Sequence, residues 1–218
     1  MKITKYIHSF IMVEEGKNRV LVDPGPFSFI EESVRADQFE GIKAIFITHK
    51  HADHYDPVAI KRIAKNNPGM KVFCNSETTE VLEEVKIGAE VFEEGGREIG
   101  GFRVTAFFAE HESLPDAVPS NTAFLFNHTF LHPGDSFDPV IFNYPAKVIA
   151  LPVFGPWMMV AKALEFVLKY SPEQIVPVHD GFVKDYFLER QYQNWERWLK
   201  GKGIKFNPCL DAGDSCKV

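Results

Sequence analysis

The stretch His49-Lys50-His51-Ala52-Asp53-His54 follows an unbroken apolar run, residues 44–47 (Ala-Ile-Phe-Ile), which predicts a buried strand. Asp56-Pro57 comes next, and a side-chain oxygen followed by proline is typical of a helix start. Three histidines and an aspartate therefore lie on one short loop. Imidazole and carboxylate groups are common ligands of zinc and its neighbours. A solvated, histidine-rich loop is the alternative, but four such side chains in six residues favour a metal site.

The spacing within this loop divides the four side chains into two pairs. On an extended backbone, His49 and His51 point the same way and can bind one ion. Asp53 and His54 lie past a turn and would face a second ion beside the first. The loop therefore predicts a site for two ions.

Composition and charge limit the class of protein. A chain of 218 residues with 45% hydrophobic and 25% charged residues predicts one soluble globular domain spanning residues 1–218. The net charge of −6 argues against sequence-independent nucleic-acid binding. No apolar run is long enough for a membrane helix, and residues 1–5 do not resemble a signal peptide. We expect a cytoplasmic protein with a small-molecule substrate and no nucleic-acid or membrane partner; a homo-oligomer is left open.

The cysteines do not predict a metal site. Cys74, Cys209 and Cys216 are widely spread and form no Cys-x-x-Cys pair, which excludes the usual thiolate zinc motif. We expect three free thiols, with a Cys209–Cys216 disulfide as the alternative.

Strand and helix patterns alternate along the chain without linkers or repeats. Apolar alternation and turn residues predict a hairpin over residues 9–22 and another around Asn127-His128. The remaining predicted strands cover residues 43–48, 72–73, 102–108, 148–151, 175–178 and 204–206, and the helices start near Pro57, Ser76, Val160 and residue 184. This mixed order predicts an α/β fold.

Three further metal-capable residues stand at the ends of predicted strands: His111, Asp135 and His179. Ligand sites of layered α/β folds gather at strand ends. Taken alone, either histidine could be structural and Asp135 could be a turn residue. The joint pattern predicts two coordination sets bridged by Asp135: His49, His51 and His111 in one, and Asp53, His54 and His179 in the other.

Several of these motifs resemble a known family. Residues 48–54 resemble the His-x-His-x-Asp-His signature of the metallo-β-lactamase superfamily, and Gly134-Asp135-Ser136 and Pro177-Val178-His179 resemble its later motifs. Four stretches are similar to small metal-dependent hydrolases related to ascorbate-phosphate lactonase: residues 6–10, 20–24, 132–135 and 179–181. The resemblance implies a four-layer αβ/βα sandwich with the metals at one edge, between two sheets.

The predicted site favours hydrolysis. Two divalent ions, two aspartates and a hydroxide leave a net charge of about +1, which favours an anionic substrate. We expect a metal-bound hydroxide to attack a small ester, a phosphodiester or a lactone. Zinc is the expected metal, with manganese or iron as alternatives. Asp53, His8 and His132 are the candidate catalytic residues, the two histidines by orienting a ligand or protonating the leaving group.

The substrate is expected to be small, because the segments between the motifs leave no room for an inserted domain. Aromatic and apolar residues on the same loops are candidates for an apolar wall, or are ordinary core and rim residues: Phe27, Phe154, Trp157, Met158 and Phe182. A β-lactamase, an iron-dependent redox enzyme of the same fold and a non-catalytic metal-binding protein are the alternative functions.

Overall fold

The apolar run before the histidine loop forms strand β4 (Ile42–Phe46), in the interior of a mixed sheet. The computed structural model describes residues 1–30, 33–115 and 117–218. Strand β4 pairs in parallel with β3 (Asn18–Val22) and β5 (Lys71–Cys74), so the loops that follow β3 and β4 leave the same edge of the sheet. The histidine loop therefore begins where the sheet ends.

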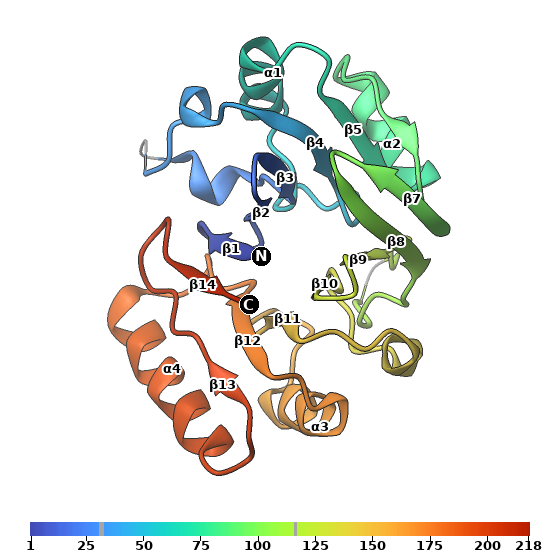
Figure 1. Ribbon diagram of the computed structural model, residues 1–218. Coiled ribbons are helices and arrows are strands. Elements are labelled where there is room, and N and C mark those ends of the chain that lie inside the picture. The colour runs from blue at the N-terminus through green and yellow to red at the C-terminus, as the bar shows by residue number, and fades with distance from the viewer. Residues whose placement is uncertain (31–32, 116) are drawn as a thin grey trace.

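Two seven-stranded sheets make up the two inner layers of the fold (Figure 1). The first sheet has the order β14 (Ser215–Lys217), β1 (Lys2–Lys5), β2 (Ile11–Glu15), β3, β4, β5 and β6 (Glu90–Val91). The second has the order β13 (Lys205–Phe206), β12 (Gln174–Val178), β11 (Val148–Pro152), β10 (Phe130–His132), β9 (Thr122–Phe126), β8 (Phe102–Phe108) and β7 (Gly95–Ile99).

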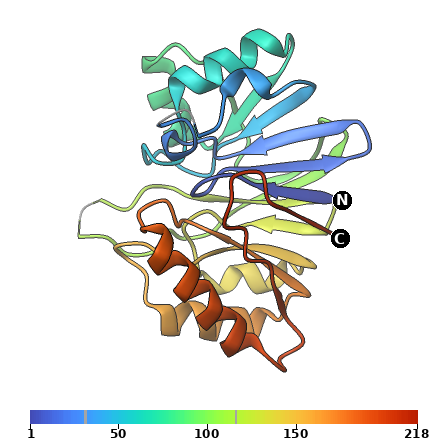
Figure 2. The ribbon, with the colours of Figure 1, turned by 90° about the vertical axis from the view of Figure 1, so that its left-hand side faces the viewer.

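Helices cover the outer face of each sheet, as Figures 1 and 2 show. Helices α1 (Pro57–Asn66) and α2 (Ser76–Glu84) pack on the first sheet, where Ile60 contributes to a core with Ile45. Helices α3 (Val160–Tyr170) and α4 (Asp185–Leu199) pack on the second, where Trp195 joins Ile175. A third core fills the space between the sheets. The predicted four-layer αβ/βα sandwich is confirmed.

The last strand returns to the first sheet. Strand β14 pairs antiparallel with β1, and the amino group of Met1 donates to the carbonyl oxygen of Val218 at 3.0 Å. The two chain ends consequently lie side by side in both views (Figures 1 and 2).

Local sequence signals account for several element boundaries. The side chain of Asp56 accepts hydrogen bonds from the N–H groups of Val58 and Ala59 at 2.8 and 3.1 Å, which confirms the predicted start of α1. Helix α2 begins at Ser76 as predicted, but Asn75 caps it by accepting from the N–H of Thr78 at 2.8 Å.

The turn of the second predicted hairpin adopts the left-handed conformation, with φ of 48° at Asn127 and 50° at His128. All three cysteines are free, as expected. Strands β1, β6, β7 and β14 were not predicted. No helix within residues 1–30, 33–115 and 117–218 combines the length and apolarity that a membrane span requires.

Candidate metal centre

The structure brings all seven predicted ligands to one edge of the sandwich, on loops that follow β4, β8, β10 and β12. They form two groups, in each of which the candidate ligand atoms lie within 4.8 Å of one another. The first group holds His49, His51, His111 and Asp135; the second holds His8, Asp53, His54 and His179.

Asp135 lies between the two groups. Its Oδ2 is 3.8 Å from Nε2 of His49 and 3.6 Å from Nε2 of His111, both in the first group. The same oxygen is 2.9 Å from Nε2 of His179, and Oδ1 is 3.5 Å from Nε2 of His54. This is the position that a ligand shared by two ions would occupy.

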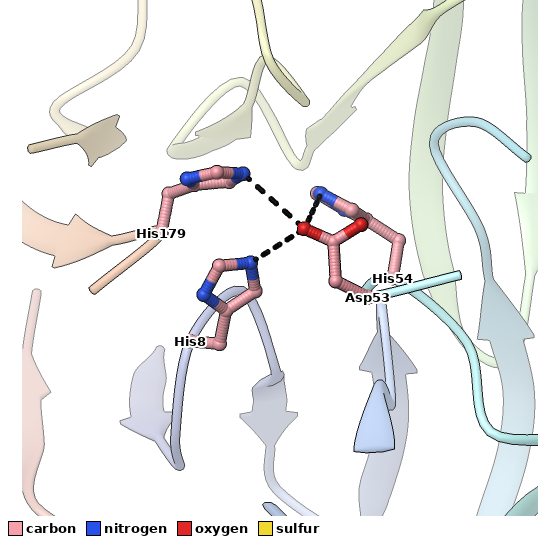
Figure 3. A group of neighbouring side chains, drawn as sticks. All are labelled: His8, Asp53, His54 and His179. Atoms are coloured by element: carbon pink, nitrogen blue, oxygen red, sulfur yellow. Dashed lines mark hydrogen bonds and ion pairs between the residues drawn. The ribbon is translucent and has the colours of Figure 1, made fainter. Parts of the chain in front are cut away.

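Asp53 occupies the centre of the second group (Figure 3). Its Oδ2 lies 3.1 Å from Nε2 of His8, 3.6 Å from Nε2 of His179 and 4.0 Å from Nε2 of His54. The Asp53 side chain is 23% exposed, whereas the three histidine side chains are at most 2% exposed. Solvent therefore reaches this group past Asp53.

Hydrogen bonds at Nδ1 orient three of the imidazoles. Nδ1 of His54 donates to Oδ2 of Asp23 at 2.8 Å, Nδ1 of His111 to the carbonyl oxygen of Glu112 at 2.6 Å, and Nδ1 of His179 to that of Phe154 at 2.7 Å. Each of these hydrogen bonds keeps the ring proton on Nδ1. The Nε2 atom of each ring therefore carries a lone pair, which faces the centre.

His49 and His51, the other two histidines of the first group, also direct ring nitrogens toward one shared position. Thr48 donates its hydroxyl proton to Asp23 at 2.7 Å, so its Oγ1 accepts from Nδ1 of His49 at 3.0 Å. Nε2 of His49 then presents a lone pair, and it lies 2.9 Å from Nδ1 of His51. Two ring nitrogens this close are arranged to bind one cation together.

The donor atoms fit a metal. Within the described residues, Nε2 of His54, Nε2 of His111 and Oδ1 of Asp135 are buried and have no hydrogen-bond partner. A buried polar atom without a partner is destabilising, by about 1–3 kcal/mol. Cations bound in the two groups would satisfy these three atoms, and imidazole with carboxylate is a donor set typical of zinc and related metals.

The pKa values of the buried groups also point to a cation. Burial lowers the pKa of His49 well below its usual value, so its imidazole is neutral, as a ligand must be. Burial opposes a charge on His54 too, but the Asp135 and Asp23 carboxylates raise its pKa well above the usual value. A carboxylate environment that raises the pKa of a buried imidazole in this way also favours a bound metal cation.

His8 differs from the other histidines. Its Nδ1 accepts a hydrogen bond from the N–H of Gly181 at 3.1 Å, so the ring proton is on Nε2, which donates to Asp53. Burial lowers the pKa of His8 to about 4, which keeps the ring neutral. Its backbone, with φ of 66°, donates to Oδ1 of Asp180 at 3.1 Å and accepts from the N–H of His179 at 3.2 Å.

His132, a predicted catalytic residue, belongs to neither group. Its buried ring donates from Nε2 to the carbonyl oxygen of Ser9 at 3.2 Å, and Nδ1 accepts from the N–H of Gly134 at 3.3 Å. Both ring nitrogens are therefore engaged by the backbone, and the ring ties the loop before Asp135 to the loop of Ser9.

Asp23 is a site residue that the sequence analysis missed. Its buried carboxylate accepts from the N–H and the hydroxyl of Thr48, at 2.8 and 2.7 Å, and from Nδ1 of His54. An available signal was its position at the end of a predicted strand, directly before Pro24-Gly25, where the other site residues also stand.

Comparisons with known proteins agree with this geometry. A family model described as a β-lactamase superfamily domain matches residues 2–179. Protein Rv0786c of Mycobacterium tuberculosis is 30% identical over 195 residues, covering 84% of this chain and 85% of that protein. A UPF0173 metal-dependent hydrolase of Methanocaldococcus jannaschii is 29% identical over 187 residues, covering 81% of this chain and 83% of that protein.

Solved structures share the fold. Igni18, a metallo hydrolase from Ignicoccus hospitalis, superimposes with a TM-score of 0.74 at 22% identity, covering 100% of this chain and 98% of that one. An isothiocyanate hydrolase from Delia radicum gut bacteria gives a TM-score of 0.72 at 14% identity, covering 100% and 99%. At these identities the likeness extends to the fold alone.

Proposed function

The chain belongs to the metallo-β-lactamase superfamily and is similar to UPF0173 metal-dependent hydrolases. We propose that residues 1–218 form a single domain that uses two divalent ions to hydrolyse a small ester. The observation that carries this proposal is the placement of Asp135. Its two carboxylate oxygens face histidines of both groups, including Nε2 of His54 and Nε2 of His111, which are otherwise unpaired.

Each group would hold one ion. His49, His51 and His111 would bind the first, and Asp53, His54 and His179 the second, with Asp135 shared between them. Zinc is the proposed metal, because imidazole with carboxylate is its common donor set; manganese and iron accept the same ligands. When bound, such ions supply an activated water as nucleophile and polarise the oxygen on which charge develops.

The chain's own residues prepare this site. Asp23 and the carbonyl oxygens of Glu112 and Phe154 hold imidazole rings with their lone pairs inward. His8 donates its Nε2 proton to Oδ2 of Asp53, which orients that carboxylate toward the second group. We therefore assign His8 as a positioning residue that acts through Asp53, and not as a metal ligand.

The reaction proposed is hydrolysis of a phosphodiester or a lactone. The water oxygen bonds to the phosphorus or acyl carbon, the bond to the leaving oxygen breaks, and the leaving alkoxide takes the proton that the water loses. Two divalent ions outweigh the charge of Asp53 and Asp135, which favours a substrate that carries or develops negative charge. The motif resemblance to ascorbate-phosphate lactonase adds sugar-phosphate lactones to the candidates.

The test combines metal analysis with activity. The purified chain, loaded separately with zinc, manganese and iron, is assayed on bis-p-nitrophenyl phosphate, simple lactones and a sugar-phosphate lactone. We expect two ions per chain and hydrolysis of at least one ester class. Asp135→Ala should bind fewer than two ions and lose hydrolysis while its circular dichroism is unchanged, and the exposed Asp211→Ala serves as the matched control.

Two results would contradict the proposal. Full activity in Asp135→Ala would exclude the shared ligand. A wild-type protein that holds iron, absorbs visible light and hydrolyses none of the esters would favour the redox alternative.

A further inference from the structure

Aromatic rings flank His179 on two sides. The ring of Trp157 lies 5.1 Å from the ring of His179 and 5.9 Å from that of His111, measured between centroids. The ring of Phe182 lies 5.4 Å from that of His179 at an angle of 54°. One aromatic side chain therefore adjoins both groups of candidate ligands, and another adjoins the second group.

Phe27 extends this aromatic surface beside His8. Its ring lies 4.7 Å from that of His8 and meets the ring of Phe182 edge-on at 5.0 Å. Phe182 in turn lies 4.9 Å from His8. We call Phe27, Trp157 and Phe182 the aromatic rim.

Two glycines make room for the rim. A Cβ added at Gly155 would lie 2.8 Å from Cε2 of Trp157, and one at Gly181 would lie 2.9 Å from Cγ of Phe27. Any side chain at either position would displace the ring. The loops after β11 and β12 are thus built to seat these aromatic residues next to the histidines.

Within the rim Phe27 and Trp157 are partly buried, Phe182 is exposed, and further exposed apolar residues lie next to it in the chain. Phe182 is 54% exposed, and Met159, which follows the loop of Trp157, is 68% exposed. Tyr186 and Phe187, at the start of α4, are 75% and 40% exposed. Exposed apolar surface beside a polar site is characteristic of ligand-binding surfaces, because a ligand that covers it gains about 25 cal/mol for each Å² removed from water.

Carboxylates neutralise three of the lysines that lie around the centre. Three lysines each form an ion pair with a carboxylate, and in every pair one residue adjoins a site histidine in sequence: Lys5 with Asp180 (2.8 Å), Lys50 with Glu77 (2.6 Å) and Lys162 with Glu112 (2.6 Å). These lysines therefore do not offer a second anion site next to the metal centre.

We propose that the substrate carries a planar apolar substituent that lies on Trp157 and Phe182, beside the reacting group. The inference rests on the proposed ester hydrolysis, because it places this substituent beside the bond that is cleaved. Aryl or other flat, unsaturated esters fit this description.

The test compares two phosphodiesters with the same leaving group and charge, phenyl p-nitrophenyl phosphate and methyl p-nitrophenyl phosphate. With the zinc-loaded wild type we expect kcat/KM to be about tenfold higher for the phenyl ester, mainly through KM. The ratio should fall below about threefold in Phe182→Ala and in Trp157→Ala. Phe108→Ala, which removes a ring that is 58% exposed and outside the rim, should keep the wild-type ratio.

A binding measurement separates this inference from the proposed function. Calorimetric titration of zinc-loaded protein with phenylphosphonate and methylphosphonate should give the same preference, and Phe182→Ala should lose it. Preferential binding without turnover of either ester would contradict the proposed phosphodiester hydrolysis and keep the rim as a binding surface. Equal turnover of both esters, or a wild-type ratio retained in both rim variants, would overturn the inference. So would a dimer that Phe182→Ala converts to monomer without changing the ratio.

Discussion

Gly181 donates its backbone N–H to Nδ1 of His8 across 3.1 Å, and this contact gives His8 the opposite hydrogen-bond polarity from the neighbouring histidines. His54 and His179 donate from Nδ1 and so present a lone pair at Nε2. His8 presents a proton at Nε2, which it donates to Asp53. A ring held in this tautomer orients a metal ligand; it does not serve as one.

Replacing His8 tests this assignment. We expect His8→Ala to bind two ions, with affinity at the second group or activity lower by about 10- to 100-fold, the usual effect of losing a partner of a metal ligand. His8→Gln should recover part of the loss, because its amide N–H can again donate to Asp53. Metal content, zinc affinity and kcat/KM are measured together, and His128→Ala, in an exposed turn, is the matched control. Loss of one full ion in His8→Ala, without recovery in His8→Gln, would identify His8 as a ligand.

Asp23→Asn should weaken metal binding without removing a predicted ligand. The carboxylate of Asp23 accepts the Nδ1 proton of His54 and two hydrogen bonds from Thr48. An amide replaces one acceptor oxygen with a donor, so we expect zinc affinity to fall by about 10- to 100-fold. Competition with a chromogenic chelator measures the change. Asp56→Asn, which preserves the helix cap of α1, should bind zinc as the wild type does; equal affinity in both variants would mean that Asp23 does not orient His54.

Site residues could be predicted from the sequence where their partners are near in the chain, and not where the partners are far apart in it. The loop of residues 49–54 was recognisable because its ligands are adjacent in the chain. Asp23 was not, because its hydrogen bonds to Thr48 and His54 span 25 and 31 residues and exist only once β3 pairs with β4.

His132 was predicted as a catalytic residue, but its contacts are those of a structural histidine. It stands at a strand end like His179, yet both of its ring nitrogens bind backbone groups, and one of these, the carbonyl oxygen of Ser9, is 123 residues away. Residue type and position could not separate a ligand from a structural histidine. Strands β7 and β14 escaped prediction for a related reason: most of their residues are exposed, so they lack a strong apolar signal.

Metal removal should destabilise the domain. Chelation leaves the Nε2 atoms of His54 and His111 and Oδ1 of Asp135 buried without partners in the described part of the chain. At free zinc about 100 times Kd, each site adds about 2.7 kcal/mol to the free energy of unfolding. For a chain of this size, about 2–4 °C of Tm corresponds to 1 kcal/mol. Thermal unfolding with chelator, and again after zinc is restored, measures the effect; a Tm independent of zinc would contradict it.

The three thiols should be unreactive in the folded protein. Burial raises the pKa of Cys74 to about 11 and that of Cys209 to about 12, and it also raises the pKa of Cys216. Because only the thiolate reacts, and a raised pKa keeps the thiol protonated, a colorimetric disulfide reagent at about pH 8 should label none of them. Unfolding in guanidinium should release three reactive thiols. Rapid labelling of the folded protein, or fewer than three thiols after unfolding, would contradict this expectation.

Each group of candidate ligands draws side chains from loops of both sheets: His49 and His54 follow a strand of the first sheet, whereas His111 and His179 follow strands of the second. An ion bound in either group would therefore cross-link the two halves of the sandwich at one edge. Any fluctuation that parts the sheets there must first break metal–ligand bonds, so metal loading should slow hydrogen exchange in the inter-sheet core on both sides at once.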